Sequence, residues 1–220
     1  MTRDVGAVRG PIARIEPAGP PGDLDRGAAL LVVLLIAALL AGLGSGLVVL
    51  TTTEMQIAAN HRTAGETLYA AEAIVDRAVR DLRAAPQWTA VLNGTTPSTF
   101  CDATRRPTLR SRETVDLDAI TVELQAESDA AWGANNPVWR LYAWGALASM
   151  GGGLDRASSY VAAWVSDDPS ERDGNPLQDT NNRIRLHAEA YVSSQTRRVV
   201  EATVVREATG VRVLTWREVR

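Results

Sequence analysis

The stretch AALLVVLLIAALLAGLGSGLVVL, residues 28–50, decides the architecture of this chain. It holds 23 residues without a charge, and Ser45 has its only polar side chain. As an α-helix it would span roughly 35 Å, enough to cross a hydrocarbon core of about 30 Å. We therefore predict one membrane-spanning helix over residues 28–50.

Residues 1–27 form a polar leader, for which three interpretations compete. A secretory signal peptide has a basic start and an apolar core of about 7–15 residues, but here the core is longer and four arginines are balanced by four acids. A plain signal anchor fits the length. A prepilin-type leader also explains the charged segment that ends at Gly27, directly before Ala28. Cleavage between these two residues would leave the apolar helix in the product.

The distribution of arginines predicts how the span is oriented. Arg9, Arg14 and Arg26 precede the span, and Arg62 lies close after it. This asymmetry favours a cytoplasmic N-terminus, because positively charged flanks stay on the cytoplasmic side.

Small residues form a ridge inside the apolar segment. Ala38, Gly42 and Gly46 recur every four residues, the small-xxx-small spacing that lets helix backbones approach closely. We interpret this ridge as a helix-packing surface or as a segment that loosens during extraction from the membrane, with ordinary glycine tolerance as the alternative.

The helical pattern continues over residues 51–85 with a single apolar face. Apolar residues recur at steps of three and four, as in an amphipathic helix. They are Leu68, Ala71, Val75, Val79 and Leu82. Pro86 ends the pattern, because the residue before a proline is pushed out of the α region.

The remaining residues, 86–220, are predicted to form a soluble head domain. After a loop over 87–112 and a short helix over 116–128, the period changes to two, which is typical of strands. The expected strands are 138–147, 159–166, 183–192, 197–208 and 211–219. Four or five antiparallel strands with one face on the helix give an α+β fold. In the third strand, His187 falls on the face away from the helix, so we expect a surface or interface histidine.

Composition excludes several classes of function. The net charge of −3 offers no basic surface for nucleic acid, and all 23 basic residues are arginine. The two histidines lie far apart, and Cys101 is the only cysteine, interpreted as a buried small residue with a free thiol as the alternative. No nucleophile or phosphate-binding motif is present, so we predict that the chain is not an enzyme. Four tryptophans are assigned to core or sheet-face packing: Trp139, Trp144, Trp164 and Trp216.

An acidic segment over residues 166–182 is the one candidate metal site. Its carboxylates are Asp167, Asp168, Glu171, Asp173 and Asp179. Oxygen ligands in a loop suit Ca²⁺, but the spacing matches no EF-hand. A solvated acidic loop is the simpler interpretation, with Ca²⁺ binding as the alternative; no other cofactor is predicted.

Residues 26–82 resemble the N-terminal region of PilX-type minor type IV pilins. The threonines after the apolar helix, the AAN segment at 58–60 and YAAEA at 69–73 show the similarity. The resemblance implies cleavage by prepilin peptidase and N-methylation at Ala28. It also implies a single-pass inner-membrane protein with a periplasmic head that later enters a pilus. Its partners would be major and other minor pilins, the peptidase and the inner-membrane assembly platform.

One position departs from the pilin pattern. Most pilins have glutamate at the fifth residue after cleavage, where this chain has Val32. In those pilins the carboxylate is thought to pair with the terminal amine of a neighbour, and Val32 removes it. The departure suits a subunit that initiates a filament or sits at its tip. Two alternatives stay open: a minor pseudopilin of a type II secretion system, whose tip subunit is usually larger, and a membrane-anchored binding or sensor protein.

Overall fold

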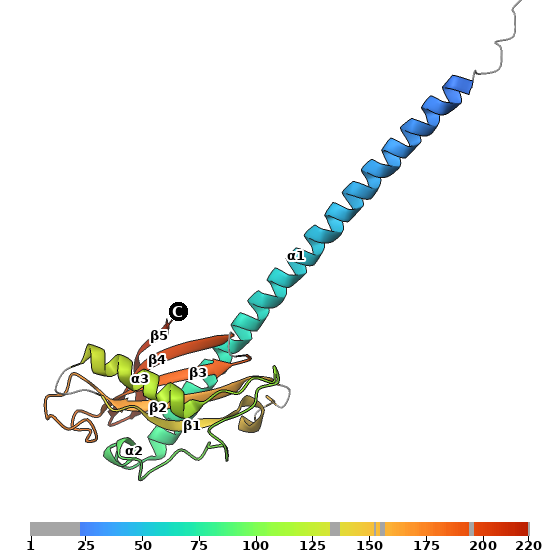
Figure 1. Ribbon diagram of the computed structural model, residues 1–220. Coiled ribbons are helices and arrows are strands. Elements are labelled where there is room, and N and C mark those ends of the chain that lie inside the picture. The colour runs from blue at the N-terminus through green and yellow to red at the C-terminus, as the bar shows by residue number, and fades with distance from the viewer. Residues whose placement is uncertain (1–22, 133–136, 152, 155–156, 194–195, 220) are drawn as a thin grey trace, which may run out of the picture. The chain divides into compact units, whose positions relative to one another are not determined.

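The computed structural model describes residues 23–132, 137–151, 153–154, 157–193 and 196–219 (Figure 1). Most of the predicted leader therefore lies outside the described residues, as do Asn135 and Asn136. Helix α1 (Asp23–Ala84) runs through the whole apolar stretch and its amphipathic continuation, which confirms the predicted long helix. The chain divides into two compact units at residue 56, and the second unit, Ile57–Arg220, includes the amphipathic end of α1.

Five antiparallel strands form one sheet in chain order, β1-β2-β3-β4-β5. They are β1 (Arg140–Ala146), β2 (Tyr160–Asp167), β3 (Arg183–Tyr191), β4 (Arg197–Glu207) and β5 (Gly210–Val219). Each strand pairs with its neighbour in the chain. All five predicted strands are present, and the α+β fold with an antiparallel sheet is confirmed.

One face of the sheet packs on the amphipathic end of α1. The predicted stripe is confirmed: Ala71, Val75, Val79 and Leu82 are buried and Leu68 is partly buried. Alanines from both elements line the contact; they are Ala70, Ala71, Ala78, Ala163, Ala188, Ala190 and Ala202. Because both sides of this contact consist largely of small side chains, larger residues here would overpack the core.

The opposite face of the sheet is covered by α3 (Leu117–Ala131), as Figure 1 shows. A second buried cluster forms between them, with Leu117 and Leu124 from α3 against Trp139 and Trp164 from the sheet side. The head thus has three layers, whereas the sequence predicted a sheet with one buried face. The prediction of a surface His187 is wrong, because this second layer leaves only 7% of the residue exposed.

The connections match the prediction in part. The helix expected at 116–128 is present as α3, and Asp116 caps its N-terminus by accepting hydrogen bonds from the backbone amides of Asp118 and Ala119. The predicted loop over 87–112 contains a short helix, α2 (Thr89–Leu92). Four residues are too few to show a helical period, so the pattern gave no signal for α2.

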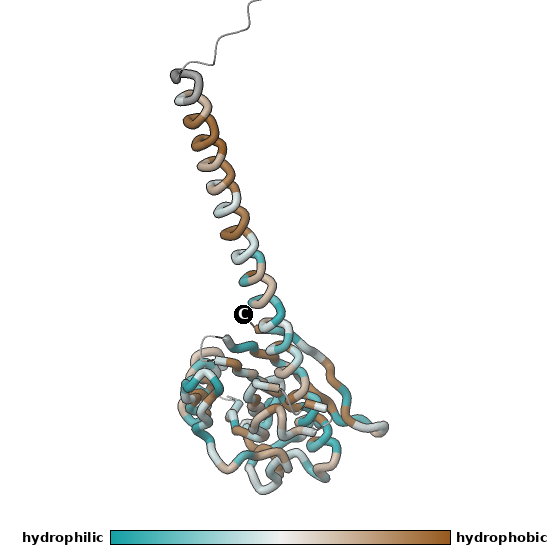
Figure 2. Tube along the Cα trace, turned by 90° about the vertical axis from the view of Figure 1, so that its right-hand side faces the viewer, coloured by the Kyte–Doolittle hydropathy of each residue, from teal (hydrophilic) through white to brown (hydrophobic). Residues whose placement is uncertain are grey.

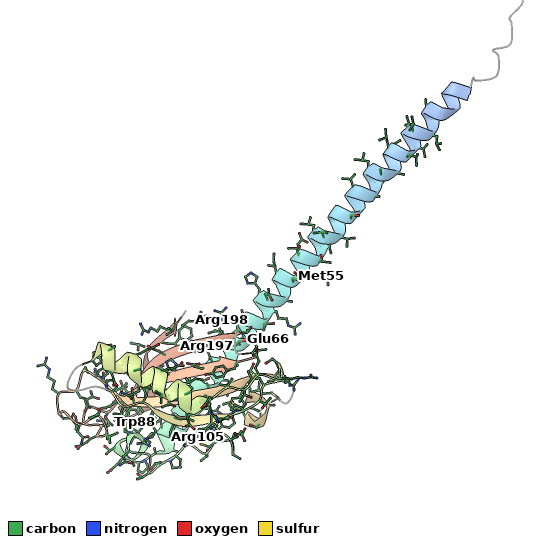
Figure 3. The ribbon with its side chains drawn as sticks, in the orientation of Figure 1. Met55, Glu66, Trp88, Arg105, Arg197 and Arg198 are labelled. Carbon is green, nitrogen blue, oxygen red and sulfur yellow. The ribbon has the colours of Figure 1, made fainter. Side chains whose placement is uncertain are left out.

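An arginine of β4 fixes the C-terminal end of α1. The guanidinium of Arg206 donates hydrogen bonds to the carbonyls of Leu82 (3.2 Å), Ala85 (2.6 Å) and Pro86 (2.6 Å). It lies 4.7 Å from the ring centroid of Trp88, which is labelled in Figure 3. Carbonyls at the end of a helix have no partner within the helix, so Arg206 satisfies those of Ala85 and Pro86 and shares that of Leu82 with Trp88 Nε1 (3.0 Å).

Candidate functional site

The first part of α1, from Gly27 to Leu50, has an apolar surface that no other part of the described chain covers. Figure 2 shows the hydrophobic colouring concentrated there. Every residue from Gly27 to Arg62 is exposed, and Val32 keeps 54% of its surface. The helix is long and apolar enough to cross a membrane. Leucines and valines in this number belong against lipid or other helices, which makes the segment a candidate membrane anchor.

Hydroxyl groups in this part of α1 are satisfied by the helix itself. Ser45 donates to the carbonyl of Ala41 (2.9 Å), and Thr51 donates to that of Leu47 (2.9 Å). Thr52 and Thr53 both donate to the carbonyl of Val49 (2.8 and 2.9 Å). Because each hydroxyl has a backbone partner, these residues can enter an apolar environment without an unpaired polar group.

The small-residue ridge lies on an unbroken helix. Ala38, Gly42 and Gly46 are exposed, and α1 is helical throughout this region. A Cβ atom added at Gly42 or Gly46 would meet nothing within 4 Å. The isolated chain therefore leaves room beside the ridge, and the predicted packing role stays a prediction.

The acidic segment joins β2 to β3, and the fold brings three of its five predicted ligands together. Ligand oxygens of Asp167, Glu171 and Asp173 all lie within 4.8 Å of one another. Asp167 and Glu171 are buried, and Asp173 is exposed. A fully solvated acidic loop is thus not what the structure contains, because two of the carboxylates are inside.

The other two predicted ligands make hydrogen bonds within the loop. Asp168 accepts from the amide and hydroxyl of Ser170 (3.1 and 2.7 Å). Asp179 accepts from the amide of Arg183 (3.2 Å), and its pKa is raised by burial and by the charge of Glu171. These two residues shape the loop without joining the group of three.

The sequence did not predict a buried network of charged residues on the face of β3 that α3 covers. His187 Nε2 lies 2.8 Å from Glu189 Oε1, and His187 Nδ1 lies 3.6 Å from Glu201 Oε1. Tyr191 donates to Glu189, and Arg217 donates to Glu201 (2.6 Å). The sequence does place His187 and Glu189 on the same face of the strand. Such alternation is also typical of a face in contact with water, and only the position of α3 distinguishes a buried face from a solvated one.

This network gives the head a pH window of greatest stability. Contact with His187 outweighs burial and, with Arg217 and Arg185, lowers the pKa of Glu201 from 4.5 to about 2. An acid of this kind contributes stability above about pH 4.5 that is lost as the pH falls toward 2. Burial alone would lower the pKa of His187, but Glu189 and Glu201 outweigh it and raise that pKa above 6.5. The stability that protonated His187 contributes is fully present below pH 6.5 and is lost as the pH rises through the raised pKa.

We therefore expect His187→Gln to flatten the decline in melting temperature above pH 6.5. The measurement is thermal unfolding of the full chain in detergent from pH 5 to 9. His61→Gln is the matched control, because His61 is exposed on α1, and its profile should follow the wild type. An unchanged slope in His187→Gln would show that protonation of this histidine does not stabilise the fold.

The remaining predicted residues divide between core and surface. Trp139 and Trp164 are buried as expected, Trp144 is partly buried, and Trp216 is 46% exposed on β5. Cys101 is exposed, so its assignment as a buried residue is wrong. Its thiol still contacts the carbonyls of Ser98 (3.3 Å) and Tyr142 (3.5 Å) from the surface.

Among the described residues, one long N-terminal helix is apolar in its first part and packs on an antiparallel sheet in its second, which is a pilin-like arrangement. Residues 26–75 match the family model described as PilX N-terminal, so this part of the chain is similar to the N-terminal region of PilX-type proteins. This match confirms the resemblance seen in the sequence. Searches among curated proteins and among solved structures found no match.

Proposed function

We propose that this chain is a minor type IV pilin that initiates a filament or sits at its tip after cleavage between Gly27 and Ala28. It acts as a structural subunit in contact with other pilins, and its head lies in the periplasm before assembly. The observation that supports this role most directly is Val32, an exposed apolar residue of α1 at the position where most pilins have glutamate.

The physical argument concerns charge in an apolar environment. Cleavage leaves an amine at Ala28, at the start of a run with no carboxylate before Glu54. An ammonium group in hydrocarbon is costly unless it is paired. A neighbouring subunit with a glutamate can pair with this amine, but this chain offers no carboxylate at Val32 in return. This chain can therefore form the amine–carboxylate pair with one neighbouring subunit only, as a subunit at the end of a filament would.

Coexpression with prepilin peptidase tests the first part of the proposal. We expect the mass to fall by that of residues 1–27, with N-methylated Ala28 as the new first residue. Gly27→Val should abolish processing, because the substitution places a branched side chain beside the cut bond. Gly46→Ala is the control and should be processed normally. An intact leader on the wild-type chain would favour the membrane-anchored sensor.

Abundance in sheared filaments tests the second part. An initiating or tip subunit should be present far below the level of the major pilin. Equal abundance would contradict a role at the filament end. Loss of protein secretion together with intact pili in a deletion strain would favour the pseudopilin alternative.

A further inference from the structure

We propose that the loop between β2 and β3 binds Ca²⁺ through the carboxylates of Asp167, Glu171 and Asp173. Their ligand oxygens lie within 4.8 Å of one another. Calcium binds oxygen at 2.3–2.6 Å, so two ligands on opposite sides of the ion are about 5 Å apart. The three carboxylates can thus surround one ion without a large movement of the loop.

Asp167 is the observation that separates this cluster from an ordinary acidic surface. It is the last residue of β2, only 2% exposed, and neither carboxylate oxygen has a hydrogen-bond partner among the described residues. It is two positions beyond Val165, so the alternation of the strand places it on the same sheet face as the core against α1. A buried carboxylate without a partner is costly, and a cation supplies the missing partner.

The neighbouring charges add to that cost. Ligand oxygens of Glu171 and Asp173 lie within 4.8 Å of that of Asp167, so three negative charges meet at one point of the loop. Without a cation, these three carboxylates repel one another, and that of Asp167 is also desolvated. A bound divalent cation offsets both the repulsion and the desolvation.

Glu171 is already held in position for binding. Its Oε1 accepts from the backbone amides of Thr180 (2.9 Å) and Asn181 (2.6 Å), and its Oε2 accepts from the Thr180 hydroxyl (2.9 Å). These bonds fix the carboxylate beside Asp167. Asp173 lies at the exposed rim, where water can complete the six to eight oxygen ligands that Ca²⁺ takes. A site open on one side should bind with a Kd on the order of 10⁻⁴–10⁻³ M, as in extracellular modules.

The dimensions of the cluster favour Ca²⁺ over Mg²⁺. Magnesium requires oxygen ligands at about 2.0–2.1 Å in near-ideal octahedral geometry and releases its water reluctantly. Opposite ligands would then be roughly 4 Å apart in a fixed geometry, whereas Ca²⁺ tolerates a wider range of distances and ligand numbers. Calcium accepts the observed spread, so the two ions should differ in their effect on the protein.

The test uses the full chain in detergent, freed of metal by chelation, at pH 7.5. We expect Ca²⁺ at 5 mM to raise the melting temperature by several degrees and to give a saturable heat in calorimetry, as estimated for a millimolar or tighter site. Mg²⁺ at the same concentration should have a clearly smaller effect. Asp173→Asn, an exposed substitution, should weaken Ca²⁺ binding about tenfold or more. Asp168→Asn removes the same charge from the same loop outside the group of three and should bind as the wild type does.

Asp167→Asn gives a second, independent readout. It removes the buried charge, so we expect this variant to melt higher than the metal-free wild type at pH 7.5 and to gain nothing from Ca²⁺. The proposal is overturned if the wild type shows neither heat nor a melting shift. Equal responses of Asp173→Asn and Asp168→Asn, or equal shifts with the two ions, would also overturn it, because general charge screening would then be sufficient.

Discussion

Replacing Trp164 by alanine should lower the free energy of unfolding of the head by about 3–5 kcal/mol, as estimated for large aromatic residues in a core. Trp164 is 0% exposed in the middle of β2, between the sheet and α3. Its Nε1 donates a 2.7 Å hydrogen bond to the hydroxyl of Thr121, and its ring meets that of His187 edge-on at 5.8 Å. Truncation would leave a cavity and a hydroxyl without its donor in the second layer.

Urea unfolding of the full chain in detergent, followed by far-UV circular dichroism, measures this loss. Trp216→Ala is the matched control, because Trp216 is 46% exposed on β5. We expect the control to change stability by less than about 1 kcal/mol, as surface substitutions usually do. Equal losses in the two variants would mean that α3 does not form a packed second layer in solution.

Replacing Arg206 by methionine should lower the free energy of unfolding by about 2–4 kcal/mol, as estimated for the loss of hydrogen bonds to a charged group. Methionine keeps much of the apolar stem but donates no hydrogen bond, so the carbonyls of Leu82, Ala85 and Pro86 would lose their shared donor. A hydrogen bond to a charged group contributes roughly 1.5–3 kcal/mol, and the carbonyl of the buried Ala85 would be left without this donor, whereas the Leu82 carbonyl still accepts from Trp88 Nε1 (3.0 Å). The stacking of the guanidinium on Trp88 would be lost as well.

The same unfolding measurement applies, with Arg212→Met as the control. Arg212 pairs with Glu207 at the exposed end of the sheet (2.7 Å), and its replacement should have a much smaller effect. Arg206→Lys should recover part of the loss, because lysine keeps the charge but not the planar set of donors. If Arg206→Met unfolds like the wild type, water satisfies the end of α1 equally well.

Long periodic elements were predictable from the sequence, and the packing of the far sheet face was not. The apolar run at 28–50, the stripe from Leu68 to Leu82 and the alternation in β3 each repeat often enough to indicate one structure. His187 shows the limit, since its pattern fits a solvated face equally well and the position of α3 decides its burial. The acidic segment was identified as a candidate site, but the choice of Asp167, Glu171 and Asp173 from five carboxylates depends on how the loop folds back.

The order of the elements along the chain has a consequence for folding during synthesis. The strands pair only with their sequence neighbours, so the sheet can grow one hairpin at a time as residues become available. The buried face of α1 is made first and its cover is made last, and the contact from Ala85 to Arg206 spans 121 residues. Until the strands have emerged, the apolar stripe of α1 has no sheet to pack against, and its cover is incomplete until β4 has been added. If the candidate membrane anchor before this stripe is inserted first, it would hold the unfinished chain at the bilayer during that interval and limit its encounters with other unfinished chains.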